Sequence, residues 1–370
     1  MFFNNYICPY CFTKYSKSEI LYVCPDCHTV SKKGFFEKFF ERNFVKCKNP
    51  KCKGTANRRR CPYCNEVLPK ESIETENFYF SIVGISNSGK TNYITVMLNE
   101  LSRLTEINLA LSHGNRSTLD HQNENMHQIY DLHTVPAATP AGDIMPQIWT
   151  IKNLDRRKGD TVPTYTFTIF DGAGEDYELN MDESATVCRY ILSSKAVILV
   201  IDPLVLPNVA RLIDPKIVSN SLGGAEYQTK NVSDVVTNMV QFVKNAKKIS
   251  PNKLLKIPIA VVLTKFDTIM NLPYFKTSSI IGKKSLCVRS GKVQLSEIEQ
   301  INREIKIWLQ SIGERSFINL LDSNFSEYKI FGVSSYGAPP IDSTNLPQTI
   351  KPHRVLDPLL WLFKLQGFLN

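Results

Sequence analysis

The segment GISNSGKT (residues 84–91) carries two glycines five positions apart, and a lysine and a threonine follow the second glycine. In a loop of this composition, successive backbone N–H groups converge on phosphate oxygens. We expect Lys90 to reach the β- and γ-phosphates of a nucleotide and the Thr91 hydroxyl to ligate Mg²⁺. The predicted nucleotide contacts of this segment are Gly84, Ser86, Asn87, Ser88, Gly89, Lys90, Thr91 and Asn92.

A second motif, Asp-x-x-Gly, occupies residues 171–174 directly after the apolar run TYTFTIF. An acidic residue at the tip of a neighbouring strand is placed to hold Mg²⁺, and we expect Asp171 to do so through water. The backbone N–H of Gly174 is expected to meet the γ-phosphate. The motif is weak by itself, but its position after a strand and about 80 residues beyond the loop strengthens it.

A third motif, Thr-Lys-Phe-Asp at residues 264–267, ends the apolar run IPIAVVL. The Asp267 carboxylate can accept hydrogen bonds from the ring N–H and the exocyclic amine of guanine, a donor pair that adenine lacks. The stem of Lys265 can lie over the base. Further along, YKIFGVSSYG offers the backbone N–H of Ser335 to the guanine carbonyl oxygen. The simpler alternative is an exposed lysine and aspartate at a strand end.

These motifs need an α/β scaffold that brings strand ends together. The run before the loop predicts a buried strand, and the apolar spacing after it predicts a helix. Continuous apolar runs indicate parallel strands buried on both faces. We therefore predict a P-loop NTPase fold with a mostly parallel central sheet over residues 77–370, with long inserts at 107–146, 203–230 and 268–293.

Eight of the ten cysteines lie before residue 70 in four pairs. Paired Cys-x-x-Cys turns point their sulfurs at one spot, and two such turns complete a tetrahedral Zn²⁺ site. Disulfide bonds are the alternative, but disulfide frameworks rarely use paired Cys-x-x-Cys turns, which are called knuckles below. We predict two tandem zinc ribbons over residues 1–70, joined in chain order: one site from Cys8, Cys11, Cys24 and Cys27, and the other from Cys47, Cys52, Cys61 and Cys64.

The formal net charge of +9 belongs to the N-terminal segment, because residues 1–70 hold 14 Lys and Arg against 5 Asp and Glu. Two tetrathiolate zinc sites reduce this to +5 without removing the basic character. A basic segment of this kind can bind nucleic acid or an acidic partner. The alternative is a solvated face on a small domain that metal holds together.

In order, Gly-x4-Gly-Lys-Thr, Asp-x-x-Gly, Thr-Lys-x-Asp and Ser-Ser each follow a strand, a pattern that resembles the translation-factor-like (TRAFAC) class of P-loop GTPases, close in plan to Ras-like G domains. The resemblance covers about residues 77–370 and implies GTP binding and slow hydrolysis used as a molecular switch. Thr264 stands where the commoner motif has asparagine. With its zinc ribbons, the chain is similar to the bacterial double-GTPase type of conflict and defence loci, although one G domain is visible here.

The resemblance also implies a first-switch threonine that completes the Mg²⁺ shell. Thr134 and Thr139 are the candidates, and we favour Thr139 because it lies in the more loop-like ATPAG. Where Ras-like proteins carry a glutamine that orients water, this chain has Glu175. Such a protein is expected to wait for an activating partner.

No apolar run approaches the ~20 residues that a membrane helix needs. The N-terminus also lacks the charged region and cleavage site of a signal peptide. We therefore expect a cytoplasmic protein with no transmembrane segment. The rival function is a nucleic-acid-binding zinc-ribbon module that a G domain regulates.

Overall fold

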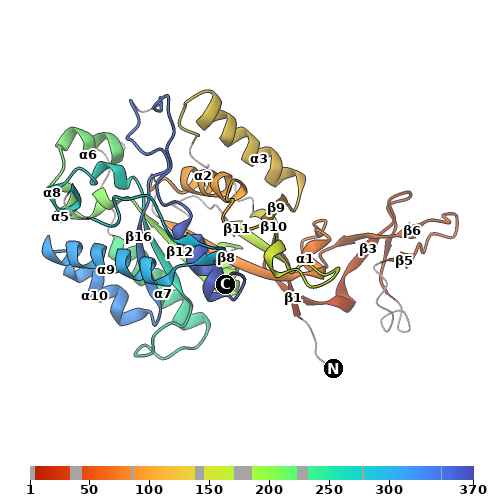
Figure 1. The fold of residues 1–370 in the computed structure, drawn as a ribbon. Coiled ribbons are helices and arrows are strands. Elements are labelled where there is room, and N and C mark those ends of the chain that lie inside the picture. Colours follow the sequence, from red (N-terminus) through yellow and green to blue (C-terminus); the bar gives the residue numbers. More distant parts are fainter. Residues whose placement is uncertain are drawn as a thin grey trace.

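A computed structural model of the chain describes residues 5–33, 44–84, 87–137, 146–170, 186–222, 232–276, 279–342 and 344–370. Its centre is a seven-stranded sheet in the order β16-β13-β12-β8-β11-β10-β9, which Figure 1 shows with helices on both faces. The strands are β8 (Glu76–Gly84), β9 (Leu109–His113), β10 (Pro146–Asn153), β11 (Thr164–Phe170), β12 (Ala196–Ile201), β13 (Ile259–Leu263) and β16 (Tyr328–Gly332).

The sheet is mostly parallel. β8 pairs in parallel with β11 on one side and with β12 on the other, and the parallel ladder continues through β13 to β16. Only β10 breaks the pattern, since it runs antiparallel to both β11 and β9. The predicted α/β fold with a mostly parallel central sheet is confirmed.

Alternate residues of each central strand face opposite sides of the sheet, as the two-residue period of a strand requires. In β8, Tyr79 and Val83 pack into one core and Phe80 and Ile82 into the other. Both sets are apolar because helices cover both faces. The first core is completed by α4 (Thr186–Ser193), α7 (Val232–Ala246), α9 (Leu295–Ser311) and α10 (Arg315–Asn324), and the second by α2 (Lys90–Ser102) and α11 (Asp357–Leu365).

The sequence did not predict β9, an edge strand whose residues are all half-buried or exposed. Its insert continues as α3 (Arg116–Met126) and the π-helix η3 (His127–Asp131), where a helix was expected. Short elements fill the other connections: α1 (Glu71–Glu74), η4 (Leu154–Arg156), η6 (Pro203–Val205), α5 (Pro207–Ala210), α6 (Pro215–Leu222), η7 (Phe266–Thr268), α8 (Pro273–Lys276), β14 (Val288–Arg289) and β15 (Lys292–Val293). Within the described residues, no helix is long and apolar enough to span a membrane.

The N-terminal segment forms small antiparallel sheets that extend away from the central sheet (Figure 1). β1 (Asn5–Ile7) pairs with β2 (Lys14–Ser16), which the short helix η1 (Lys17–Glu19) follows. β3 (Leu21–Val23) lies between β4 (Val30–Ser31) and β7 (Arg58–Arg60), and β5 (Val45–Lys46) pairs with β6 (Thr55–Ala56). A separate small apolar cluster holds this segment together, and four of its buried members are cysteines.

Candidate functional site

The phosphate loop, residues 84–91, leaves the carboxyl end of β8 and enters α2. This is where the sheet order turns from β11 to β12, the position at which open α/β sheets bind ligands. Asn87 and Gly89 have left-handed backbone, with φ of 62° and 77°. Residues of this kind turn successive N–H groups towards one side and create a concavity for an anion, to which the N-terminus of α2 adds its positive end.

Gly84 is packed too closely to carry a side chain, since a Cβ there would lie 2.6 Å from the carbonyl oxygen of Val200 on β12. The Lys90 ammonium, on a side chain that is largely buried, donates to the Gly84 carbonyl at 3.1 Å. The buried atoms Ser88 Oγ and Asn92 Oδ1 have no hydrogen-bond partner among the described residues. Buried polar atoms of this kind normally find a partner, and a phosphate or a metal-bound water would provide one.

The Thr-Lys-Phe-Asp motif is hydrogen-bonded directly to the phosphate loop. The Thr264 hydroxyl donates to the Ser88 carbonyl at 2.7 Å, and the Lys265 ammonium donates to the Asn87 carbonyl at 3.0 Å. Lys265 also has left-handed backbone, with φ of 48°. The structure therefore joins two motifs that are more than 170 residues apart in sequence.

Asp267, in η7, lies against the turn that follows β16. Burial raises the pKa of its carboxyl group, and a hydrogen bond from Ser334 opposes that rise. Ser334 is fixed in turn, because its N–H donates to the His353 carbonyl at 3.0 Å and its hydroxyl accepts from the Gly337 N–H at 2.8 Å. The half-buried Ser335 follows in the same turn, so the predicted base contacts come from neighbouring segments.

The segments predicted to bind the γ-phosphate and Mg²⁺ adjoin the same end of the sheet, where β11 finishes and β10 starts. Pro146, the first residue of β10, lies opposite Phe170, the last residue of β11. Because β11 is parallel to β8, the carboxyl end of β11 lies at the same end of the sheet as the carboxyl end of β8, from which the phosphate loop emerges. Five predicted site residues lie outside the described residues, and their roles stay predictions: Ser86, Thr139, Asp171, Gly174 and Glu175.

Thr134, the alternative first-switch threonine, belongs to a turn. Its hydroxyl donates to the Gln128 carbonyl at 3.4 Å, and its backbone forms an antiparallel bridge with Asn345. The following N–H, of Val135, donates to the Thr344 carbonyl at 2.8 Å. Because these contacts tie Thr134 to the segment after the Ser334 turn, Thr139 stays the favoured prediction.

The eight N-terminal cysteines form two tetrads, and the predicted pairing is wrong. The outer tetrad is Cys8, Cys11, Cys61 and Cys64, and the inner tetrad is Cys24, Cys27, Cys47 and Cys52. The first knuckle thus joins the last, and the two middle knuckles join each other. The reason is the long-range pairing of β3 with β7, which brings the two ends of the segment together.

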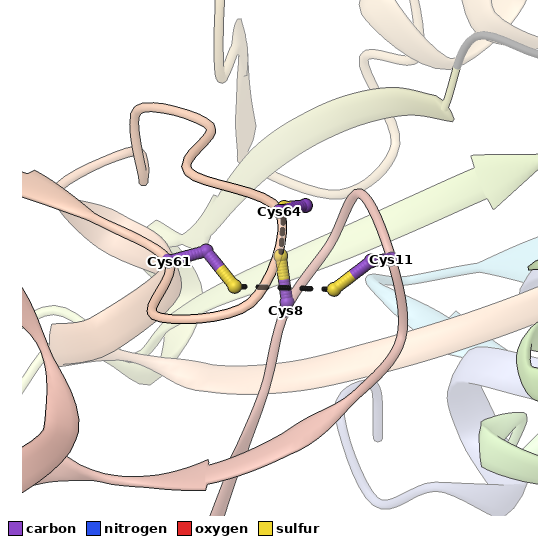
Figure 2. Close-up of side chains that lie close together, drawn as sticks. All are labelled: Cys8, Cys11, Cys61 and Cys64. Carbon is purple, nitrogen blue, oxygen red and sulfur yellow. Dashed lines mark hydrogen bonds between the residues drawn. The ribbon is translucent and has the colours of Figure 1, made fainter.

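The geometry of both tetrads suits Zn²⁺. Four sulfurs about 2.3 Å from a central zinc lie about 3.8 Å from one another. The outer tetrad has Sγ–Sγ distances of 3.7 Å (Cys8–Cys64) and 3.9 Å (Cys11–Cys61). Figure 2 shows the four side chains converging on one another. Backbone N–H groups donate to both outer and inner sulfurs, for example from Tyr10 to Cys8 at 3.4 Å.

Two features of the candidate sites, one in the cysteine segment and one beside Lys265, were not predicted from the sequence. One signal for the nested pairing was present, because the first and last knuckles are both CPYC and these are the two that join. The other feature is the buried Asp202, whose carboxylate contacts Lys265; no local pattern marks it, because the contact crosses from β12 to β13.

No family model matches the chain. It is 24% identical to the putative ESX-1 scaffolding and assembly protein SaeC of Mycolicibacterium smegmatis, over 82% of this chain and 78% of that protein. Among solved structures, the small GTPase Arl6 of Trypanosoma brucei, bound to GppNp, is 14% identical over 80% of this chain and 99% of its own, with a TM-score of 0.33. The GTPase-like domain of Ski7 from S. cerevisiae, bound to GDP and phosphate, is 14% identical over 79% of this chain and 50% of its own, with a TM-score of 0.33. Likeness at this level does not establish a family.

Proposed function

We propose that this chain binds GTP and GDP with Mg²⁺ and hydrolyses GTP slowly as a molecular switch. The observation that carries the proposal is the attachment of the Thr-Lys-Phe-Asp motif to the phosphate loop, through Thr264 to Ser88 and Lys265 to Asn87. A phosphate loop alone serves many nucleotides. A base-contacting motif fixed to it by hydrogen bonds sets the distance between the phosphates and the base.

Guanine is the base that this arrangement favours. The Asp267 carboxylate accepts from two adjacent donors of guanine, and the Ser335 N–H donates to its carbonyl oxygen. Adenine has neither the donor pair nor the carbonyl, so it would leave the half-buried Asp267 carboxylate without the two donors that guanine supplies. Burial raises the pKa of Asp267, and hydrogen bonds from the two guanine donors would stabilise its charged form.

The residues that would hold Mg²⁺ are Thr91, Asp171 and Thr139. The metal, when bound, neutralises charge on the β- and γ-phosphates. Lys90 contributes a second positive charge there. In this proposal the Gly174 N–H and Glu175 meet the γ-phosphate and the attacking water.

Calorimetry with GTP, GDP and ATP tests the assignment. The native protein should prefer GTP and GDP over ATP by at least about 10³-fold, because the mismatch leaves buried hydrogen-bonding groups unpaired. Equal binding of ATP and GTP contradicts the proposal.

Asp267→Asn gives a sharper version of this experiment. Xanthine has a carbonyl oxygen where guanine has its exocyclic amine, so the asparagine amide N–H should suit it. The variant should lose GTP and gain XTP. Glu299→Gln is the control, because Glu299 pairs with Lys329 and belongs to none of the predicted nucleotide contacts; it should change neither affinity.

The two tetrads are proposed to hold two Zn²⁺ per chain and to stabilise a segment too small to fold by its own core. The sequence similarity to a putative scaffolding and assembly protein supports a switch that acts on a larger protein complex and responds to a partner. A pulldown that compares GTP-loaded and GDP-loaded protein tests this, and identical partners in both states would oppose it.

A second function, binding of nucleic acid by the basic N-terminal residues 44–65, is favoured by their charge. Residues 44–65 contain seven Lys and Arg and no Asp or Glu. The exposed ones among them are Lys46, Lys48, Lys51, Lys53 and Arg58. Binding of single-stranded RNA that weakens steeply with salt, and that is lost when Lys48, Lys51 and Lys53 become glutamate, would support this function. Salt-independent or unchanged binding would reject it.

A further inference from the structure

The turn that follows β16 and carries the proposed base contacts is paired with a second segment of the chain. The Ser334 N–H donates to the His353 carbonyl at 3.0 Å, and the His353 N–H donates back to the Ser334 carbonyl at 2.8 Å. Further along the turn, the Lys351 N–H donates to the Tyr336 carbonyl at 2.9 Å. Because the pairing runs along the turn, the position of residues 351–353 sets the position of the turn.

Arg354 is the next residue of that second segment, and its side chain is only 1% exposed. Its backbone is left-handed, with φ of 53°. A bulky residue rarely has positive φ, and it keeps this conformation only where its surroundings hold it in place. The contacts of the Arg354 guanidinium group provide that restraint.

The guanidinium group of Arg354 donates to four acceptors. Nε donates to the Ile281 carbonyl at 3.1 Å, and Nη2 donates to the Ile280 carbonyl at 3.0 Å. Nη1 lies 2.8 Å from the Asp357 carboxylate, and Nη2 lies 3.0 Å from the Glu297 carboxylate. Hydrogen bonds between charged groups are the strong ones, and the planar fork of arginine fits several acceptors at once. Arg354 therefore fastens its own segment to Ile280 and Ile281.

The part of the 268–293 insert that receives these hydrogen bonds is also held from α9. The Glu304 carboxylate accepts from the Ile280 N–H at 3.0 Å and from the Ile281 N–H at 3.1 Å. The ring of His353 contributes from the other side, because its Nε2 lies 2.6 Å from the Ile281 carbonyl oxygen. The insert is thus a fixed support to which Arg354 is anchored.

We propose that Arg354 is a positioning residue for guanine recognition: it fixes residues 351–354 on the insert, and these residues place the turn that offers the Ser335 N–H to the base carbonyl oxygen. The inference rests on the proposed function and deepens it. It assigns part of the base specificity to a residue that lies behind the predicted base contacts. It also gives the insert a role in nucleotide binding.

The inference separates the two sides of the base. Asp267 meets the amine side, and its segment has a separate attachment, since the Phe266 N–H donates to the Val333 carbonyl at 3.0 Å. Ser335 meets the carbonyl side, which depends on the turn. GDP and IDP both have the carbonyl oxygen, whereas the 2-aminopurine nucleotide keeps the amine and lacks that oxygen. Displacement of the turn should therefore weaken GDP and IDP and spare the 2-aminopurine nucleotide, but a general loosening of the site should weaken all three alike.

The test compares Arg354→Lys with Arg59→Lys in the full, zinc-loaded chain. Lysine keeps the charge but cannot reach four acceptors from one planar group. Arg59 is the matched control, because it is also a largely buried arginine that donates to a carboxylate, of Glu74 at 3.0 Å, and to a carbonyl, of Lys70 at 3.4 Å.

We expect Arg354→Lys to speed hydrogen exchange at residues 333–337 of the nucleotide-free protein. It should weaken GDP and IDP about fivefold or more, as loss of one hydrogen bond does, and change the 2-aminopurine diphosphate by less than about twofold. Arg59→Lys should match the native protein in exchange at 333–337 and in all three affinities, which competition against a fluorescent GDP analogue measures.

Unchanged exchange at 333–337 in Arg354→Lys, or equal weakening of the three nucleotides, would overturn the proposal. Should Arg354→Lys fail to fold, Glu297→Gln takes its place, since it removes one charged partner of Arg354 and keeps an oxygen for the Leu286 N–H. The same readouts should then move in the same direction by smaller amounts, and their constancy would equally overturn the proposal. If the native protein binds no guanine nucleotide, the proposed function fails, and hydrogen exchange still decides whether Arg354 holds the turn.

Discussion

The Lys265 ammonium lies 2.8 Å from Oδ2 of Asp202, in an ion pair whose carboxylate is only 2% exposed. The same ammonium donates to the Asn87 carbonyl, and the other Asp202 oxygen accepts from the Leu204 N–H at 2.9 Å. Asp202 follows β12, Lys265 follows β13 and Asn87 follows β8. One charge pair therefore links the ends of three strands at the proposed base site.

Asp202→Asn should weaken GTP and GDP alike by about tenfold or more, since hydrogen bonds to charged groups contribute about 1.5–3 kcal/mol. Both nucleotides are affected because the pair lies on the base side of the site. Calorimetry measures the two affinities. The control is Glu314→Gln, another buried carboxylate that accepts a backbone N–H, from Asn208 at 2.8 Å. A loss confined to GTP would contradict this role for Asp202.

Asp267 is predicted to make the nucleotide-free protein less stable at neutral pH. Its pKa is raised in the folded state by burial, so the folded state binds the proton more tightly than the unfolded state does. Stability is then highest below the unfolded pKa of about 3.9 and falls as pH rises through the folded pKa. Asp267→Asn should raise the melting temperature at pH 7–8, and the gain should shrink as the pH approaches 4.

The control for this pH series is Asp342→Asn, because hydrogen bonds from Asn345 and Thr344 lower the pKa of Asp342. Its carboxylate stabilises the fold above the unfolded pKa, so its replacement should lower the melting temperature at neutral pH. Shifts of the same sign for both variants would show that burial of Asp267 has no such effect.

Gly84→Ala should destabilise the fold by about 1–3 kcal/mol, as overpacking of a close-packed site typically does. The added Cβ would lie 2.6 Å from the Val200 carbonyl oxygen, so β8 and β12 would have to separate. Gly282→Ala is the matched control, since its Cβ would find no atom closer than 3.7 Å. Denaturant unfolding of both variants measures the difference; equal stability would mean that the strands accommodate the methyl group.

Nested cysteine pairing predicts how zinc content responds to double substitutions. Cys8→Ser with Cys61→Ser removes two ligands of one tetrad and should leave one zinc per chain. Cys8→Ser with Cys24→Ser damages both tetrads and should remove both ions. Elemental analysis decides, because pairing in chain order would give the reverse result. Disulfides in reductively purified protein would reject zinc altogether.

Glu175→Ala should change the single-turnover rate of GTP hydrolysis while GTP affinity stays nearly constant. A carboxylate near the phosphates brings negative charge and lacks the amide donor of glutamine, so native turnover should be slow without a partner. Lys90→Ala, by comparison, should lose binding. Fast hydrolysis that is independent of protein concentration and unaffected by Glu175→Ala would show that the chain needs neither this residue nor an activator.

Features that consecutive residues encode could be predicted from the amino-acid sequence alone. The phosphate loop is local, because its N–H groups belong to neighbouring peptides between one strand and one helix. The central strands were recognisable because a strand covered on both faces must be continuously apolar, as IPIAVVL is. The edge strand β9 was not predicted, because its residues are half-buried or exposed and form no continuous apolar run.

Contacts between residues that are distant in sequence could not be predicted in this way, because they depend on how the whole chain folds. The four cysteine pairs are chemically alike, so their spacing does not distinguish chain-order pairing from nested pairing. The ladder between β3 and β7 selects the nested pairing. Likewise, the sequence gives no sign that Phe12, an apolar residue beside a cysteine, packs in the core with residues of α4 and β8. It also gives no sign that Asp202, at the end of one strand, forms an ion pair with Lys265 from the end of the next. Contacts between strands and between domains depend on the whole chain's packing, because their partners are set by sheet order and not by neighbours in sequence.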